Sequence, residues 1–289
     1  MQTKMPILGD NSVDSGQVTS VDEALQRVMH AIQRQRPDEA ARLAQVILAR
    51  NPSHPKALHL YGYALLMQER PDEAIAPLKK AFRSLRDPAI ETQFAIALRK
   101  AGRTDEALNT LARAVKRKPP LPAAVHEYAY LLYSLNRMDE AINLLKTGIE
   151  MAPSMPELPL LLGWIFHAQN DGINAKTAFA RAVGIAANHA DALYGMGLVL
   201  MDAGEFAKAS EYFQRALLCD PSDQQSRLYL GACFLELGQA GAASVCLRQV
   251  TRGGADFYGK ALKVLSLSSR GRFWLKPSAA VKFFKGEQT

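Results

Sequence analysis

Cysteine is scarce in this chain, with three residues among 289. The three are Cys219, Cys233 and Cys246, and no two of them have Cys-x-x-Cys spacing. An odd and widely spaced set gives neither a disulfide framework nor a zinc motif built on cysteine pairs. The sequence therefore excludes a small disulfide-stabilised fold and predicts three core thiols in a reducing compartment.

Long apolar runs are also missing. Although 48% of the residues are hydrophobic, no stretch reaches the roughly 18 consecutive apolar residues of a membrane-spanning helix. Residues 1–20 are largely polar and lack the charged-then-apolar pattern of a secretory signal. We expect residues 1–20 to be disordered and the protein to be cytoplasmic.

Motifs for catalysis and for cofactors are absent too. The six histidines form no His-Glu-x-x-His motif and no close metal spacing. Residues 254–261 resemble a phosphate-binding loop, but Ala261 stands where that loop needs a hydroxyl for magnesium. We expect no enzymatic activity, no metal and no cofactor.

What the sequence does contain is a ladder of seven alanines. Five of the six steps between them are 34 residues and one is 33. The ladder consists of Ala40, Ala74, Ala107, Ala141, Ala175, Ala209 and Ala243. A fixed period of this length indicates a helical solenoid, in which each repeat buries its apolar face against its neighbours.

Other positions keep phase with the ladder when its alanine is numbered 20 in each unit. Position 8 is Gly or Ala after the first unit, position 27 is mostly small, and position 32 is proline in four units. Position 24 is large and apolar after the first unit, and reads Ala44, Leu78, Leu111, Leu145, Phe179, Phe213 and Leu247. This pattern resembles the tetratricopeptide repeat family. The resemblance implies an all-α fold, a right-handed superhelical solenoid of antiparallel helix pairs.

The ladder also sets the expected boundaries. The seven repeats are predicted at about 21–54, 55–87, 88–121, 122–155, 156–189, 190–223 and 224–254. Residues 255–289 follow as a capping helix, which covers the open end of the array, and a basic aromatic tail. Near position 15 a turn should separate the two helices of each repeat, and several units have Gly or Asn there: Gly102, Asn136, Asn170, Gly204 and Gly238.

In this family the first helix of each repeat lines the concave face, chiefly through positions 2, 5, 9, 12 and 13. In repeats 4 to 6 these positions are aromatic and nearly uncharged, which suits a peptide with apolar anchors. The candidate groove residues are Tyr63, His126, Tyr130, Tyr133, Trp164, His167, Tyr194 and Tyr229. Ordinary packing between repeats is the alternative role for these aromatic residues.

Repeat numbering shows whether this chain has the carboxylate clamp of heat-shock co-chaperones. That clamp needs Lys and Asn at positions 5 and 9 of one repeat and Asn at position 6 of the next. Repeat 2 has His59 and Tyr63 instead, and repeat 3 has Gln93. We therefore do not expect binding to the acidic C-terminus of heat-shock chaperones.

The last segment carries most of the net charge. Residues 255–289 hold seven basic residues against two acidic ones, a charge of +5 out of +7 for the chain. The unusual stretch of the tail contains Arg270, Arg272, Phe273, Trp274 and Lys276. These residues are predicted either to dock back on the last repeat or to contact a partner or an anionic membrane surface. Nucleic acid is not expected as a partner, because the array is nearly balanced in charge.

The sequence thus predicts a non-enzymatic interaction module. Its groove would bind a peptide segment of a partner, with the protein acting as an adaptor or chaperone in a bacterial secretion or envelope assembly. The alternative is a peripheral scaffold of a membrane complex, attached through the basic aromatic tail.

Overall fold

The structure is a computed structural model that describes residues 20–251 and 255–267. The described residues form fifteen α-helices and no β-strand. The predicted disordered segment and the basic aromatic tail lie outside the described residues, apart from Ser20. The all-α fold class predicted from the ladder is confirmed.

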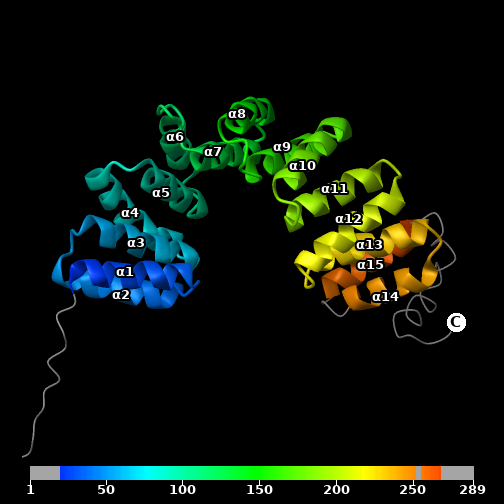
Figure 1. Ribbon diagram of the computed structural model, residues 1–289, viewed down its shortest axis with the longest axis horizontal. Coiled ribbons are helices and arrows are strands. Elements are labelled where there is room, and N and C mark those ends of the chain that lie inside the picture. Colours follow the sequence, from blue (N-terminus) through cyan, green and yellow to red (C-terminus); the bar gives the residue numbers. More distant parts are fainter. Residues whose placement is uncertain (1–19, 252–254, 268–289) are drawn as a thin grey trace, which may run out of the picture. The chain divides into compact units, whose positions relative to one another are not determined.

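The chain divides into two compact bodies, the first ending at Ala114 and the second starting at Val115. We call them the N-terminal body and the C-terminal body. The helices of the N-terminal body are α1 (Val21–Gln33), α2 (Pro37–Arg50), α3 (Pro55–Met67), α4 (Pro71–Leu85), α5 (Pro88–Lys100) and α6 (Thr104–Ala114). Those of the C-terminal body are α7 (Pro122–Ser134), α8 (Met138–Met151), α9 (Glu157–Ala168), α10 (Gly172–Ile185), α11 (Ala190–Asp202), α12 (Phe206–Cys219), α13 (Gln224–Glu236), α14 (Ala240–Thr251) and α15 (Ala255–Leu267). Within each body, consecutive helices pack side by side in chain order (Figure 1).

Local sequence explains where the helices begin. The acidic triplets starting at Pro71, Thr104 and Met138 each open a helix, where carboxylates complement the free amides of the first turn. Proline occupies the first turn of several helices, since its missing N–H is not needed there. The array starts with a capping box, in which Ser20 and Glu23 exchange hydrogen bonds of 3.2 Å.

Every turn at position 15 adopts a left-handed backbone. The predicted Gly and Asn residues have φ between 58° and 75°. Gln35 and Glu69 hold the same position in repeats 1 and 2 with φ of 56° and 57°, although the left-handed region costs such residues about 1–2 kcal/mol. The sequence offered no Gly or Asn as a signal there, so repeat geometry imposes the conformation.

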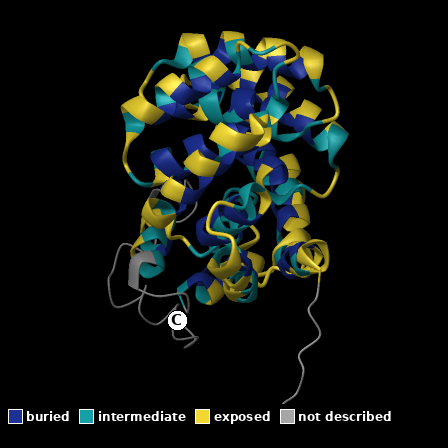
Figure 2. Ribbon diagram, turned by 90° about the vertical axis from the view of Figure 1, so that its left-hand side faces the viewer, coloured by how far each residue is buried: buried dark blue, intermediate teal, exposed yellow. Residues whose placement is uncertain are grey.

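The core is a thin layer between the helices of each body. The ladder alanines have no exposed surface, and Figure 2 shows buried residues where helices face one another and exposed residues on their outer sides. Phe179 and Phe213 are the largest fully buried side chains at position 24. They belong to the C-terminal body and position the candidate site.

Candidate functional site

Glycines hold the two buried phenylalanines of the C-terminal body in place. A Cβ atom added to Gly163 would lie 2.7 Å from the Phe179 ring, and one added to Gly195 would lie 2.5 Å from it. A Cβ on Gly197 would lie 2.6 Å from the Phe213 ring. Since real side chains do not approach so closely, only glycine lets the rings of α10 and α12 insert against α9 and α11.

Three predicted groove residues pack on these phenylalanines. The Trp164 ring lies 4.9 Å from Phe179 and 5.9 Å from Tyr194, centroid to centroid. Tyr194 is 6.0 Å from Tyr229, and Tyr229 stacks on Phe213 at 5.9 Å with an interplanar angle of 22°. The separations lie in the range in which aromatic pairs attract. We call these five residues the ring chain; it runs along α9, α11 and α13 with support from α10 and α12.

The ring chain has a buried side and an exposed side. Phe179 and Phe213 are fully buried, whereas Trp164, Tyr194 and Tyr229 are half-buried. The sequence left open whether these aromatic residues pack between repeats or face a groove, and the geometry allows both. Burial raises the pKa of the Tyr194 hydroxyl, so this side chain stays neutral over the physiological range.

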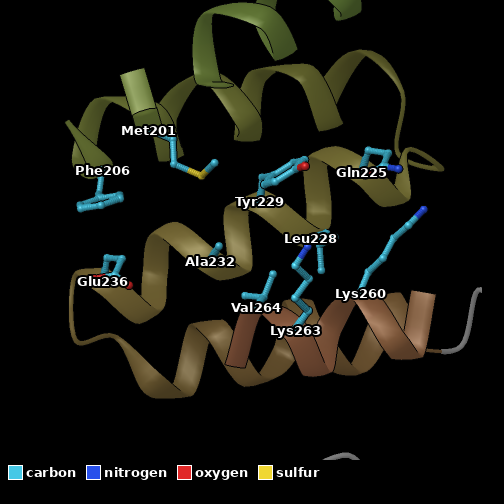
Figure 3. A pocket seen from close by; sticks show the side chains of 10 residues that line it. All are labelled: Met201, Phe206, Gln225, Leu228, Tyr229, Ala232, Glu236, Lys260, Lys263 and Val264. Atoms are coloured by element: carbon cyan, nitrogen blue, oxygen red, sulfur yellow. The ribbon is translucent and has the colours of Figure 1, made fainter. Parts of the chain in front are cut away.

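A pocket of about 500 Å³ lies at the end of the ring chain (Figure 3). Its walls come from α11, α13 and α15, with Phe206 from the start of α12. The lining residues are Met201, Phe206, Gln225, Leu228, Tyr229, Ala232, Glu236, Lys260, Lys263 and Val264. Most of this lining is apolar and a few polar groups stand around it, as in typical ligand-binding sites.

The helix α15 is both a packing element and a wall of this pocket. Its Ala261 and Leu265 are buried in a cluster with residues of α13 and α14, including Leu228 and Leu247. Its Lys260, Lys263 and Val264 line the pocket instead. The sequence predicted a capping helix here, but it gave no sign that this helix contributes to a binding surface.

Charge is distributed unevenly around the pocket. Lys260 and Lys263 stand on α15, with the Lys260 ammonium 4.9 Å from the Phe257 ring centroid. Glu236 stands at the far end of α13 from Gln225 (Figure 3), about 16 Å away along the helix axis. Next to the lining residue Ala232, burial raises the pKa of the Cys233 thiol to about 12, with Glu236 adding to the shift, so this thiol stays protonated at neutral pH.

The other predicted residues of the C-terminal body lie on α7 and α9. Tyr130 is 41% exposed, while Tyr133 and His126 are half-buried, with His126 Nδ1 3.7 Å from a Glu127 carboxylate oxygen. His167 Nε2 lies 3.1 Å from an Asp202 carboxylate oxygen, and its ring meets Trp164 edge-on. None of these four residues lines the pocket.

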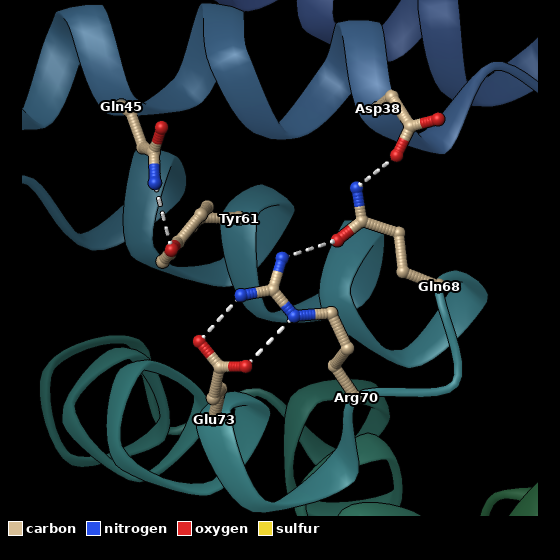
Figure 4. A network of polar contacts seen from close by, with 6 residues as sticks. All are labelled: Asp38, Gln45, Tyr61, Gln68, Arg70 and Glu73. Carbon is tan, nitrogen blue, oxygen red and sulfur yellow. Dashed lines mark hydrogen bonds and ion pairs between the residues drawn. The ribbon is translucent and has the colours of Figure 1, made fainter.

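Tyr63 belongs to the N-terminal body and is not brought into the ring chain. Polar side chains also link the first two repeats of this body (Figure 4). Gln68 donates a 2.8 Å hydrogen bond to Asp38, and Gln45 donates one of 2.9 Å to the Tyr61 hydroxyl. The sequence grouped Tyr63 with the groove by its repeat position, whereas the other seven candidate residues belong to the C-terminal body.

The predicted tail contacts, Arg270, Arg272, Phe273, Trp274 and Lys276, lie outside the described residues. Within residues 20–251 and 255–267, no helix has the length and apolarity needed to span a bilayer. The same residues contain no cluster of three or more His, Cys, Asp or Glu side chains suited to a metal ion.

Comparison with known proteins agrees with this architecture. Among solved structures, a tetratricopeptide repeat protein from Parabacteroides merdae ATCC 43184 is similar with a TM-score of 0.61 at 14% identity, over 84% of this chain and 97% of that one. Human IFIT1, solved as a dimer with m7Gppp-AAAA, gives 0.65 at 16% identity, over 92% and 71%. Pseudomonas aeruginosa PilF gives 0.53 at 16% identity, over 84% and 96%. At these identities the likeness shows the fold alone.

A search of curated proteins finds no match to this sequence. Models of the tetratricopeptide repeat, in contrast, match residues 25–85, 98–165 and 190–223. Together these matches cover more than half of the chain, and they include repeats from both bodies. The chain belongs to the tetratricopeptide repeat family.

Proposed function

We propose that this protein binds a peptide segment of a partner protein in the concave surface of its C-terminal body. Repeats of this family generally serve as protein–protein interaction scaffolds. The observation that carries the proposal is the pocket at the end of the ring chain, whose mainly apolar lining includes Leu228 and Ala232 at positions 5 and 9 of repeat 7.

The ring chain favours a protein ligand on physical grounds. Tyrosine and tryptophan offer large contact area with little loss of side-chain entropy, and they dominate binding hot spots. Phe179 and Phe213 hold Trp164, Tyr194 and Tyr229 in fixed orientations. A rigid surface loses less entropy when a ligand binds, and so it binds more tightly than a mobile one.

The pocket suits one apolar side chain of that ligand. Leu228, Ala232 and Val264 provide its contacts, and Lys263 is exposed at its edge. A carboxylate next to the anchor would meet the positive field of α15. The ligand is thus a segment with an apolar anchor and a neighbouring acidic residue.

Such a groove fits an adaptor or chaperone that holds one component of a larger assembly. We infer a bacterial secretion or envelope assembly as the setting, because the aromatic surface of Trp164, Tyr194 and Tyr229 suits a partner segment that must be shielded from water before assembly. The support for this setting is the polarity of the groove.

Filling the pocket tests the proposal with little damage to the core. Ala232→Phe adds a ring from a half-buried position that lines the pocket. We expect this variant to lose at least tenfold in affinity for the partner that the wild type captures, with unchanged helicity by circular dichroism. Ala76→Phe, at an exposed site of α4, adds the same ring elsewhere and should bind as the wild type does. Equal capture by all three proteins would place the binding site outside this pocket.

A further inference from the structure

A second groove lies on the opposite side of α9 from Trp164. It has a volume of about 380 Å³ and is formed by α8, α9 and α10. Its lining includes Lys146, Glu150, Leu162, Phe166, Ala178 and Arg181. Successive helical residues turn by about 100°, so Pro159, Leu162 and Phe166 share one face while Trp164 points the other way. This groove is therefore separate from the ring chain and the pocket.

The groove is open because position 23 of repeat 5 is small. Ala178 occupies this position, whereas repeats 4 and 6 have Leu144 and Tyr212 there. The floor is apolar: Leu162 and Ala178 are buried, and Phe166 is half-buried. An apolar floor without a covering side chain is a place for a side chain from elsewhere.

Repeat 6 shows what a filled version of the groove looks like. Three residues after Tyr212 comes Arg215, whose guanidinium carbon lies 5.2 Å from the centre of the Tyr212 ring. Repeat 5 keeps the arginine as Arg181, three residues after Ala178, but lacks the ring. A guanidinium is attracted to the face of an aromatic ring, and repeat 5 leaves that interaction for a ligand.

The rim of the groove is positively charged. Lys146 and Arg181 are both exposed, and neither has an ion pair with any residue that the structure describes. Glu150 is the one acidic residue of the lining. Two cations against one anion attract a ligand with negative charge, and arginine in particular binds carboxylates with two parallel hydrogen bonds.

We propose that this groove binds an acidic peptide segment that carries an aromatic side chain. The ligand's ring would lie over Ala178 and against Arg181, in the place that the Tyr212 ring takes in repeat 6. Its carboxylates would pair with Lys146 and with the free edge of the Arg181 guanidinium. This site is independent of the peptide-binding function proposed for the concave surface.

A displayed library of random twelve-residue peptides tests the proposal without a known partner. The library is selected in parallel on the wild type, on Ala178→Tyr, and on Lys146→Glu with Arg181→Glu. Ala178→Tyr copies the residue of repeat 6 and is designed to fill the groove. Two controls are Lys79→Glu with Lys80→Glu, which makes the same charge change on exposed sites of α4, and Ala232→Phe, which blocks the concave pocket.

We expect the wild type to enrich peptides with an aromatic residue next to acidic residues. These peptides should lose at least tenfold in recovery on Ala178→Tyr and on the double charge reversal, and keep their recovery on both controls. Peptides that are lost on Ala232→Phe instead belong to the concave pocket. The proposal is overturned if no aromatic and acidic peptide depends on Ala178, with circular dichroism showing that Ala178→Tyr is folded.

Discussion

Both bodies bury an apolar layer between their helices, but the more exposed side chains that link neighbouring repeats differ. In the N-terminal body, neighbouring repeats are linked by polar pairs: Gln68 with Asp38, Lys100 with Glu69 at 3.0 Å, and His59 with Gln93 at 2.7 Å. In the C-terminal body, the ring chain passes from repeat to repeat over buried phenylalanines and glycines. The period thus sets where the helices lie, and the residues that vary between repeats decide what surface the helices present.

The two bodies also differ in the polarity of the side chains that line their surface hollows. At α1 and α2, a hollow of about 700 Å³ is lined mainly by charged and polar side chains, among them Glu23, Arg27 and Glu39. The pocket of the C-terminal body is lined mainly by apolar ones. Burying charged groups against a ligand costs free energy unless each is paired, whereas apolar walls favour binding through burial alone. Of these two hollows, the one in the C-terminal body is the better site for an apolar anchor.

Removing a buried ring should have the largest effect on stability. Phe179→Ala is expected to lower the free energy of unfolding of the C-terminal body by about 3–5 kcal/mol, because a fully buried ring is lost and a cavity remains. In a Trp274→Phe background Trp164 is the single tryptophan, so its fluorescence in urea reports on this body. The matched change Leu78→Ala, at position 24 of the N-terminal body, should leave the Trp164 transition in place. If Leu78→Ala shifts the Trp164 transition as far as Phe179→Ala does, the two bodies unfold together.

Two glycines of the C-terminal body should respond with opposite signs. Gly195→Ala puts a Cβ atom against the Phe179 ring and should destabilise the body by about 1–3 kcal/mol. Gly184→Ala in α10 meets nothing within 4 Å, and should stabilise it by up to about 1 kcal/mol through the lower entropy of the unfolded chain. Urea midpoints of the two variants measure this difference. If Gly195→Ala stabilises the body, the Phe179 ring does not lie as close to the Gly195 backbone as described above.

Substitutions in the left-handed turns should change the stability of the two bodies in opposite directions, by smaller amounts. Gln35→Gly should raise the stability of the N-terminal body by up to about 1 kcal/mol, since glycine relieves a left-handed backbone at φ 56°. Gly204→Gln, at the same position of repeat 6, should lower that of the C-terminal body by about 1 kcal/mol. Thermal unfolding followed by circular dichroism checks both signs, and a loss of stability in Gln35→Gly would count against a strained turn.

These turns also show how far the sequence could predict the structure. The ladder was sufficient for the helix pairs, for the repeat order and for the left-handed turns at Gly and Asn. It was not sufficient for Gln35 and Glu69, whose conformation comes from the neighbouring helices rather than from their own preference. The ladder also did not predict the division after Ala114. At this division α6 has 11 residues where α2 has 14. The sequence marks it by Pro119 and Pro120, which follow a basic run.

The geometry of the candidate site was likewise predictable only in part. Repeat numbering selected Trp164, Tyr194 and Tyr229, because side-chain direction on a helix follows from position alone. The wall formed by Lys260, Lys263 and Val264 depends on how α15 packs against α13. That packing lies outside the repeat pattern, so repeat numbering does not predict it.

The smallest predicted effect concerns a surface ion pair between repeats 5 and 6. Lys208 and Lys176 donate hydrogen bonds to Glu205 and lower the pKa of its carboxyl group to about 2. A lowered pKa means that this contribution to stability is present above the ordinary pKa of Glu and is lost as pH falls toward 2. Lys176→Ala with Lys208→Ala should return the pKa of Glu205 toward its ordinary value, which an NMR titration would show. An unchanged pKa in this variant would mean that other groups lower it.

Site-specific photocrosslinking tests most directly that the C-terminal body holds the partner. A benzophenone side chain replaces Tyr229, at the pocket, or Tyr63, at concave position 9 of repeat 2 in the N-terminal body. Each protein is irradiated with the captured partner. The proposed function predicts a crosslinked product from the Tyr229 replacement and none from the Tyr63 replacement. A crosslink from Tyr63 alone would contradict it and place the binding surface in the N-terminal body.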